Sequence, residues 1–320
     1  MKALTATFAA ALLLLSGASL AQAWPAKPVR YIVPFPPGGP PDTGARLLGE
    51  RLTKVWGQTV IVDNRAGAGG IAGGAAGAKA APDGYTLFQC NIATNAIAYS
   101  LYAKIPYDPR DFAAITRIST TAIGIVAHPS LPAANVREFI AYARANPGKL
   151  SYGATATGSS PQLAMELFKL TARVDIVHIA YKGAAFAIAD AMGGQIPVAV
   201  STLPPLVAPV QAGRLRALVV TGAKRASAWP SVPTAIESGM PGFEVTSWYG
   251  VCAPAGTPKP VLDKVHADVT AALSTRELQQ KLLELMMEPA PMSPGDFDAF
   301  MRAETGKWAR VVNEAAIPQQ

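Results

Sequence analysis

Near its N-terminus the chain reads PVRYIVPFPPGGPPD over residues 28–42 and continues with TGARLLGERLTKV to residue 55. The apolar run at residues 28–35 predicts a buried strand, and apolar residues at helical spacing predict a helix over residues 42–55. In the turn between them, glycines let backbone N–H groups approach a ligand, prolines stiffen the loop, and Asp42 is placed to cap the helix. This unit predicts an anion-binding loop at a helix N-terminus; a turn that only connects is the alternative.

The same alternation of strand and helix continues along the chain. Strands are expected at residues 58–62, 85–89, 112–118, 122–127, 149–153, 175–179, 197–201, 215–220 and 243–252, and helices at residues 71–81, 136–146, 161–171, 184–192, 205–212, 261–273 and 277–287. Such alternation predicts parallel sheets flanked by helices, which is the α/β class.

Two α/β units are expected, joined by crossover strands at residues 112–127 and 243–252. We expect residues 24–122 and 248–320 to form domain I and residues 123–247 to form domain II. The hinge should lie near residues 119–127 and 245–252. Because ligands of open α/β sheets bind beyond the carboxyl ends of the strands, a ligand cleft is expected between the domains.

Composition limits the class of protein. Half of the residues are hydrophobic and 15% are charged, which excludes an intrinsically disordered chain. The net charge is +7, but no run of five basic residues occurs, so the positive charge is dispersed and nucleic acid is not an expected partner.

The first 23 residues have the pattern of a secretory signal peptide. Lys2 is followed by an apolar run from Phe8 to Leu15 and by the small-x-small site at residues 21–23. A membrane anchor, the alternative, needs about 20 apolar residues. We therefore expect cleavage after Ala23 and a periplasmic protein without a membrane span.

The two cysteines, Cys90 and Cys252, both lie in strand-like runs. In an oxidising compartment they either form a disulfide or remain two buried thiols, and the sequence leaves both possibilities open. Neither belongs to a Cys-x-x-Cys motif, so no metal site is expected.

A second candidate anion site is the segment YGATATGSSP at residues 152–161. Pro161 suits the first position of a helix and Ser160 its N-cap. Small hydroxyl and amide donors precede them, and a carboxylate would find these donors beside the positive end of the helix dipole. An ordinary capped helix start is the alternative.

The segment GAGGIA at residues 67–72 matches the dinucleotide-binding fingerprint only nominally. No acidic residue ends the following strand, where a ribose partner belongs, so close packing of helix on sheet is the better interpretation. No cofactor is expected.

Signals for catalysis are weak. Gly-x-Ser-x-Gly is absent, and His128, His178 and His266 all lie where a structural role is expected. Asp108 and Asp111 lie in a turn, so they do not indicate a paired-carboxylate mechanism. No catalytic residue is expected.

Short motifs run in order over nearly the whole chain after residue 23. They include Trp24-Pro-x-Lys-Pro28, Val33-Pro-Phe-Pro-Pro-Gly-Gly39, Asp63-Asn-Arg-x-Gly-Ala-Gly-Gly70, Pro82-Asp-Gly-Tyr-Thr-Leu87, Tyr181-Lys-Gly183 and Pro254-Ala-Gly-Thr-Pro258. As a set they resemble the Bug family, the extracytoplasmic receptors of tripartite tricarboxylate transporters. The resemblance implies a type II periplasmic-binding-protein fold whose two domains close on a small carboxylate ligand.

The resemblance also implies where the ligand lies. The ligand-binding residues it indicates are Phe35, Gly38, Gly39, Asp42, Asn91, Thr94, Ala154, Thr155, Thr157, Gly158, Ser159, Tyr181, Ser201 and Thr202. Two of them depart from the usual pattern: Thr157 stands where Asn is common, and Ser201 where many members have Asp. Without that Asp, an amino-acid ligand is disfavoured and a carboxylate without a nearby cation is favoured.

These observations predict an exported, non-enzymatic receptor for a small organic anion, acting as a monomer with the membrane components of a tripartite tricarboxylate transporter. Lys182 should attract anions at long range rather than pair with the ligand. An exported enzyme acting on a carboxylate ester is the alternative function, and an adhesion module without a ligand cleft is a third.

Overall fold

The computed structural model describes residues 24–320; the expected signal peptide and its cleavage site lie outside the described residues. The strands are β1 (Val29–Val33), β2 (Val60–Asn64), β3 (Thr86–Asn91), β4 (Phe112–Ala127), β5 (Leu150–Thr155), β6 (Ile176–Tyr181), β7 (Val198–Thr202), β8 (Arg216–Val220), β9 (Thr246–Pro254) and β10 (Glu288–Pro289). The α-helices are α2 (Pro40–Trp56), α3 (Ile71–Ala78), α4 (Ala98–Leu101), α5 (Val136–Ala145), α6 (Ser160–Ala172), α7 (Ala184–Met192), α8 (Pro204–Gln211), α9 (Lys259–Leu273), α10 (Arg276–Glu284) and α11 (Pro294–Glu314). Short helical turns are η2 (Ala68–Gly70), η3 (Ala93–Ile97) and η4 (Pro109–Asp111).

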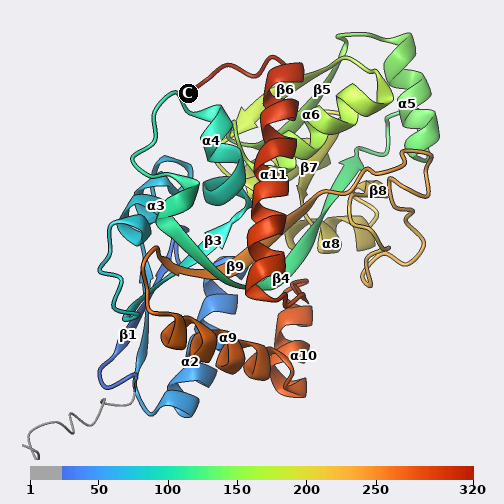
Figure 1. Cartoon of the computed structure of the whole chain (residues 1–320). Helices are drawn as coiled ribbons and strands as arrows, with labels where there is room; N and C mark the ends of the chain where they lie inside the picture. Colours follow the sequence, from blue (N-terminus) through green and yellow to red (C-terminus); the bar gives the residue numbers. More distant parts are fainter. Residues whose placement is uncertain (1–23) are drawn as a thin grey trace, which may run out of the picture.

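One half of the molecule is built on β1, β2 and β3, which run parallel to one another. The antiparallel strand β9 pairs with β3 and with the first part of β4, so the strand order is β2-β1-β3-β9-β4. Helices α2, α9 and α10 pack together beside this sheet (Figure 1). The carboxyl ends of β1, β2 and β3 therefore meet at one edge.

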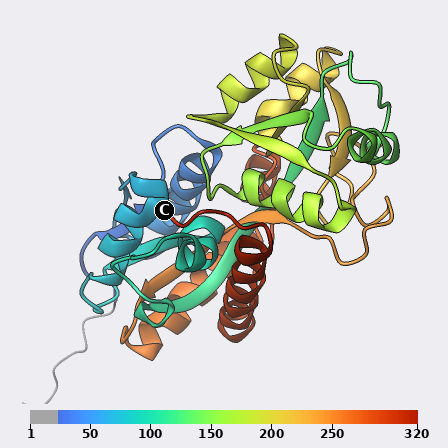
Figure 2. The ribbon, with the colours of Figure 1, turned by 90° about the horizontal axis from the view of Figure 1, so that it is seen from above.

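The other half repeats this arrangement. β5 runs parallel to both β6 and β7, and the last part of β4 pairs antiparallel with β7 and β8. In the view from above, the two halves lie side by side and the crossover strands run between them (Figure 2). The α/β class and the crossover strands expected from the sequence are thus observed.

β4 is a single strand, although the sequence predicted two successive strands at residues 112–118 and 122–127. The polar residues Ser119, Thr120 and Thr121 interrupt the apolar pattern, but they pair with β9 and the strand continues through them. The partner of β4 changes from β9 to β7 between Ala122 and Ile123. One continuous strand therefore links the two sheets.

A second tie between the crossover segments is the buried hydroxyl of Thr221. It donates a hydrogen bond to Val245 O at 2.6 Å, and it accepts one from Ile123 N at 3.1 Å. Because Ile123 and Val245 belong to the outgoing and returning crossovers, this one side chain joins both.

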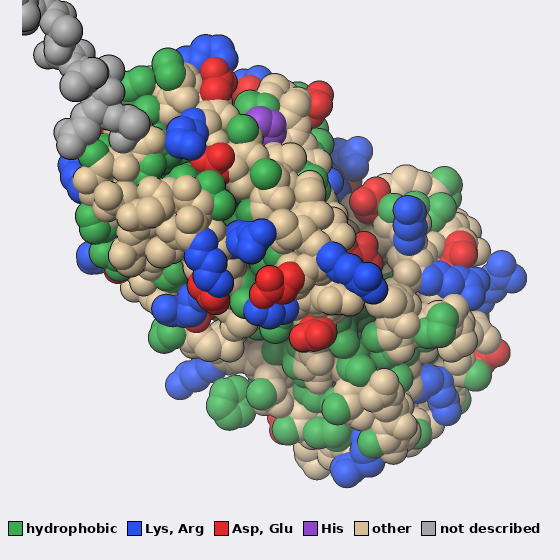
Figure 3. All heavy atoms as spheres, turned by 90° about the horizontal axis from the view of Figure 1, so that it is seen from below, with side chains coloured by type: hydrophobic (Ala, Val, Ile, Leu, Met, Phe, Trp, Pro, Cys, Tyr) green, Lys and Arg blue, Asp and Glu red, His purple; other side chains and the backbone are tan. Residues whose placement is uncertain are grey.

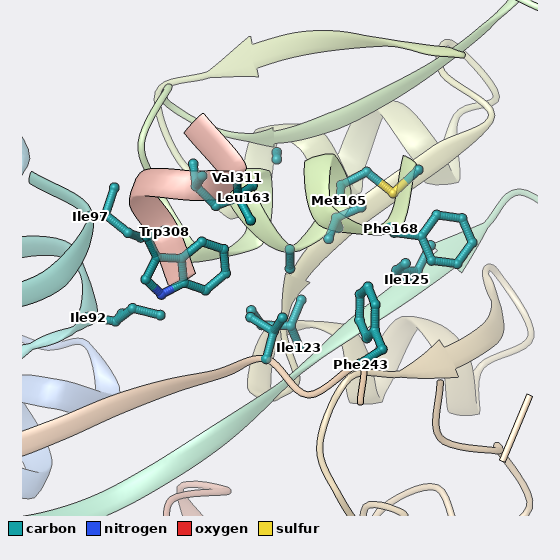
Figure 4. Close-up of a cluster of buried hydrophobic side chains, with 14 of the residues drawn as sticks. Ile92, Ile97, Ile123, Ile125, Leu163, Met165, Phe168, Phe243, Trp308 and Val311 are labelled. Atoms are coloured by element: carbon teal, nitrogen blue, oxygen red, sulfur yellow. The ribbon is translucent and has the colours of Figure 1, made fainter. Parts of the chain in front are cut away.

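Helix α11 packs against both halves. Its Trp308 and Val311 lie in the same cluster of buried side chains as Ile97 on one side and Leu163 on the other (Figure 4). The buried carboxylate of Glu304 accepts hydrogen bonds from the indoles of Trp248 on β9, at 3.1 Å, and Trp308, at 3.0 Å. The sequence predicted helices at residues 261–273 and 277–287, but not the bridging position of α11.

Cys90 and Cys252 form a disulfide in which both residues are fully buried. The bond joins β3 to the crossover strand β9. Of the two possibilities that the sequence left open, the structure therefore shows the pair.

Within residues 24–320 no helix is both long enough and apolar enough to cross a membrane, and no group of three or more His, Cys, Asp or Glu side chains is arranged to hold a metal ion. On the face drawn in Figure 3, basic and acidic side chains are interspersed, which matches the dispersed charge seen in the sequence.

Candidate functional site

A cavity of about 480 Å³ lies between the two halves, at the carboxyl ends of their parallel strands. The first wall, called here the β1–β3 wall, is formed by Pro34, Phe35, Pro36, Ala66, Gly67, Gly69, Gly70, Asn91, Ile92, Ala93, Ile97, Tyr102 and Tyr249. The second, the β5–β7 wall, is formed by Thr155, Ala156, Thr157, Gly158, Ser159, Ser160, Pro161, Lys182, Ala184, Ser201 and Thr202, and Ser247 of β9 lies between the walls. The position is the one expected for a ligand site of open α/β sheets.

The loop from Thr155 to Ser159 connects β5 to α6 and supplies much of the β5–β7 wall. The helix begins at Ser160, and its N-cap is Ser159, whose hydroxyl accepts from Gln162 N at 3.4 Å. The expected cap at Ser160 is therefore wrong by one residue, because Pro161 occupies the second helical position rather than the first. The hydroxyl of Ser160 instead pairs with that of Ser247 at 2.6 Å.

Thr155 and Thr157 differ from the two serines that follow them. Ser159 Oγ donates to Thr155 O at 2.9 Å and is thus used within the loop, whereas the hydroxyls of Thr155 and Thr157 have no side-chain partner among residues 24–320. Gly158 has a φ of +86°, and a Cβ there would collide with the side chain of Leu101 on α4. The loop therefore reaches the opposite half while leaving two threonine hydroxyls free to bind a ligand.

The electrostatics of the cavity come from dipoles and one cation. Among the described residues, Lys182 is the single charged side chain on the cavity walls, and it is exposed. Ser201 and Thr202 end β7 and add neutral hydroxyls. The N-terminus of α6 contributes a partial positive charge of about half a unit. The cavity is thus suited to an anion held largely by neutral donors.

The Pro-Gly loop before α2 contributes Phe35 to the cavity, but Gly38, Gly39 and Asp42 do not line it. Asp42 is 2% exposed and faces its own loop and helix. Its carboxylate accepts hydrogen bonds from Gly38 N at 2.9 Å, Arg46 Nε at 3.0 Å and Asn64 Nδ2 at 2.8 Å. The N-cap position belongs to Gly39, so the expected capping role of Asp42 is wrong; it clamps the loop from the first turn of the helix.

Burial by itself would raise the pKa of Asp42. The hydrogen bonds from Arg46, Gly38 and Asn64, together with the positive charge of Arg46, outweigh burial and hold this pKa below its usual value. Asn64 also donates to Phe35 O at 3.0 Å. The ionised carboxylate and its partners therefore fix the backbone that carries Phe35.

Asn91 lies at the cavity wall, but its side chain serves the loop after β3. Its amide donates to Thr94 Oγ1 at 2.8 Å, and its carbonyl oxygen accepts from Ala93 N at 2.9 Å. Thr94 is fully buried and donates to Asn95 Oδ1 at 2.6 Å, away from the cavity. These two predicted site residues build the helical turn η3.

Ala154 and Tyr181 also lie away from the cavity. Ala154 is fully buried within β5. The ring of Tyr181 packs beside Gly153, where an added Cβ would be 2.9 Å from it, and its hydroxyl donates to Asp190 Oδ2 at 2.7 Å. Tyr181, which the family resemblance indicates as a ligand-binding residue, therefore does not line the cavity.

Sequence reasoning missed several residues that line the cavity. Tyr249 projects from β9 and lies edge-to-face with Phe35, with ring centroids 6.1 Å apart. Tyr102 follows α4, with its hydroxyl against Gly69. Position in the crossover strand was the only sequence signal for Tyr249, and Tyr102 had none.

The glycine-rich segment after β2 has two roles. Gly73 lets α3 pack on the sheet, since a Cβ there would lie 2.7 Å from Pro34 Cβ. Gly67, Gly69 and Gly70 also line the cavity. The packing interpretation is therefore correct but incomplete.

No histidine, aspartate or glutamate of residues 24–320 lines the cavity. His128 Nδ1 lies 2.7 Å from Ser130 Oγ, and His266 Nδ1 lies 3.1 Å from Ile115 O. His178 stacks on Tyr152, and burial lowers its pKa. All three histidines thus have structural surroundings.

The family model described as "Tripartite tricarboxylate transporter family receptor" matches residues 45–317. The chain belongs to this receptor family. Its resemblance to the Bug proteins is confirmed by protein BugT of Bordetella pertussis, which is 35% identical over 296 residues, covering 92% of this chain and 91% of BugT.

Solved structures of related receptors share the fold. Rpa4515 of R. palustris, solved with adipate, is 36% identical, with a TM-score of 0.82 over 93% of this chain and 100% of that one. MatC of Rhodopseudomonas palustris, solved with malate, is 30% identical, with a TM-score of 0.76 over 90% and 100% of the two chains. The receptor therefore has the two-domain α/β fold of periplasmic solute-binding proteins, and it is a solute-binding receptor rather than an enzyme.

Proposed function

We propose that this receptor captures a small organic carboxylate in the cavity between its halves and delivers it to the membrane components of a tripartite tricarboxylate transporter. The observation that carries the proposal is the β5–β7 wall, where free threonine hydroxyls, the α6 N-terminus and Lys182 face one cavity without an opposing acid. Adipate and malate in related structures support a carboxylate as the ligand class.

Capture would proceed by closure of domain I, residues 24–122 and 248–320, on domain II, residues 123–247. The crossover strands β4 and β9 are the natural hinge, because β4 changes its pairing partner at Ala122 and Ile123. Hinge closure around a ligand is a motion that a membrane partner can recognise. Small-angle scattering should show a smaller radius of gyration at saturating ligand, and unchanged curves would count against closure.

Export is part of the proposal. The protein would reach the periplasm by signal-peptide cleavage after Ala23 and act there as a monomer. N-terminal sequencing of exported protein should begin at Trp24, whereas a chain still beginning at Met1 would contradict cleavage.

The ligand class is tested by thermal shift with mono-, di- and tricarboxylates, each beside its neutral amide. A ligand that binds only the native state raises the melting temperature, by an amount set by its concentration relative to Kd. At least one acid should stabilise the protein while its amide does not. Equal shifts with acid and amide, or no shift with any acid, would overturn the carboxylate assignment.

A further inference from the structure

A second cavity, called here the rear cavity, has a volume of about 340 Å³ and is formed by α6, the segment at residues 241–246, β4 and α11. It shares no lining residue with the cavity described above. Ser247 and Tyr249 of β9 line that first cavity, and Trp248 between them donates a hydrogen bond to Glu304. Glu304 lines the rear cavity. Because successive side chains of a strand point to opposite faces, the two cavities lie on opposite sides of β9.

The guanidinium of Arg117 on β4 lines the rear cavity without a counter-ion. This side chain is half-buried, its Nε donates to Ala290 O at 3.0 Å, and its guanidinium carbon lies 4.9 Å from the centroid of the Phe300 ring. Among residues 24–320 it forms no ion pair, and its two Nη atoms have no hydrogen-bond partner. Burying such a charge without a partner is unfavourable, and the planar donors of arginine match an oxyanion.

Helix α11 adds two further cations, Lys307 and Arg310, which are neighbours on the helix surface because they are three residues apart. Lys307 Nζ donates to Glu244 O at 2.6 Å and to Glu304 Oε1 at 3.2 Å, which leaves one of its three N–H donors free. Arg310 is exposed and forms no ion pair within the described part of the chain.

Two carboxylates also line the rear cavity. That of Glu304 is engaged by the indoles of Trp248 and Trp308 and by Lys307. Glu244 is exposed, and its carboxylate forms no ion pair with any residue that the structure describes. The side chains at the cavity that lack a counter-ion are therefore two arginines and one exposed acid, so the excess charge is positive.

We propose that the rear cavity binds a small polyanion, a molecule with two or more phosphate or carboxylate groups. Arg117 binds one group through its free Nη atoms, and Lys307 and Arg310 bind another at the rim. A volume of about 340 Å³ lies at the lower end of the range of small-molecule sites. This site is separate from the proposed capture of a carboxylate between the halves, so either proposal can fail without the other.

Calorimetric titration of the full receptor at low ionic strength tests the site, with inorganic pyrophosphate and tricarballylate as probes for the two kinds of oxyanion. For the probe that binds more tightly, Arg117→Gln should weaken binding by about tenfold or more, and Arg310→Gln, at an exposed position, by about two- to fivefold. Arg276→Gln makes the same change at an exposed, unpaired arginine on α10 that lines neither cavity, and it should leave the affinity unchanged.

A variant with the opposite expected effect sharpens the test. Glu244→Gln removes the unpaired acid and should tighten binding by about two- to fivefold, whereas Glu284→Gln, at an exposed acid outside both cavities, should not. Because Arg310 and Glu244 are exposed, these variants test the site even if Arg117→Gln unfolds. Three results would overturn the proposal: binding of neither probe, equal losses in Arg310→Gln and Arg276→Gln, or binding that is lost in Thr157→Val but kept in Arg310→Gln.

Discussion

The loops after β1 and β5 have the same local design, a strand that runs into a small-residue turn and a helix with proline in its first turn, yet their polar groups face opposite ways. In the first loop the strongest acceptor, Asp42, is satisfied by Gly38, Arg46 and Asn64. In the second, the hydroxyls of Thr155 and Thr157 have no protein partner among residues 24–320.

The difference shows that a loop at a helix N-terminus beside a cleft can have either of two roles. A loop whose polar groups bond to each other is a rigid support for the apolar side chain that it presents, here Phe35. A loop with unpaired donors instead keeps these donors available for an acceptor group of the ligand. Substitutions in the first loop should therefore reduce stability, and substitutions in the second should reduce affinity.

The largest loss of stability is expected from removing the disulfide, which joins β3 to β9 in the half of the molecule that carries the first loop. Replacing both cysteines, Cys90→Ala with Cys252→Ala, opens a covalent loop between residues 162 apart in sequence. The free energy of unfolding should fall by about 2–5 kcal/mol. Denaturant titration measures the loss, and the parent refolded under reducing conditions should match the double variant. If the free energy of unfolding does not fall, the disulfide does not stabilise the folded state.

Asp42→Ala should reduce stability by about 2–3 kcal/mol, because Gly38 N–H and Asn64 lose a buried acceptor. The folded pKa of Asp42 is depressed, so its contribution is present above the unfolded pKa of about 4 and is lost as the pH falls through the lower folded pKa. The stability difference between parent and variant should therefore shrink below about pH 4. Glu50→Ala, at an exposed acid on the same helix, is the control and should reduce stability much less than Asp42→Ala. A pH-independent difference would contradict the assignment.

Thr157→Val should weaken ligand binding by about ten- to a hundredfold, because one hydrogen bond to a charged acceptor contributes about 1.5–3 kcal/mol. Fold stability should change much less, since this hydroxyl has no protein partner among residues 24–320. Thr171→Val, at an exposed threonine on α6, the helix that follows this loop, makes the same chemical change outside the cavity that Thr157 lines. Unchanged affinity in a Thr157 variant that melts like the parent would remove this loop from the site.

The smallest effect is expected for Lys182→Gln. An exposed ammonium at the cavity wall attracts anions at long range, so affinity should fall about two- to fivefold at low ionic strength and hardly at all in about 0.5 M salt. Lys224→Gln, at an exposed lysine that does not line the cavity, serves as the control. A loss that persists in high salt would instead indicate a direct ion pair with the ligand.

Local patterns predicted most of the fold, because each strand and helix carries its own periodicity and each turn its own Gly or Pro. The failures lie where tertiary contacts override such patterns. The polar run Ser119–Thr121 looked like a break and is a strand, since β9 supplies its hydrogen bonds. The bridging role of α11 depends on Trp308 meeting both halves, which no local signal shows.

The sequence predicted which loops form the site, but not in which direction their side chains point. The loop after β5, with Thr155, Thr157, Gly158 and Ser159, lines the cavity. Asp42 and Tyr181 turn away, because each finds a partner, Asn64 or Asp190, that is distant or unmarked in sequence. The register that puts Tyr249 at the cavity is set by pairing with β3 and β4, which only the assembled sheet defines.

Because successive side chains of β9 point to opposite sides, tryptophan fluorescence can report on ligand binding in this receptor. Ser247 and Tyr249 line the cavity, while Trp248 between them faces Glu304, which also holds Trp308. Two of the five tryptophans thus share one carboxylate directly behind the binding site. Any tilt of β9 on ligand capture changes both indole environments at once, so unlabelled protein can signal occupancy through its own emission spectrum.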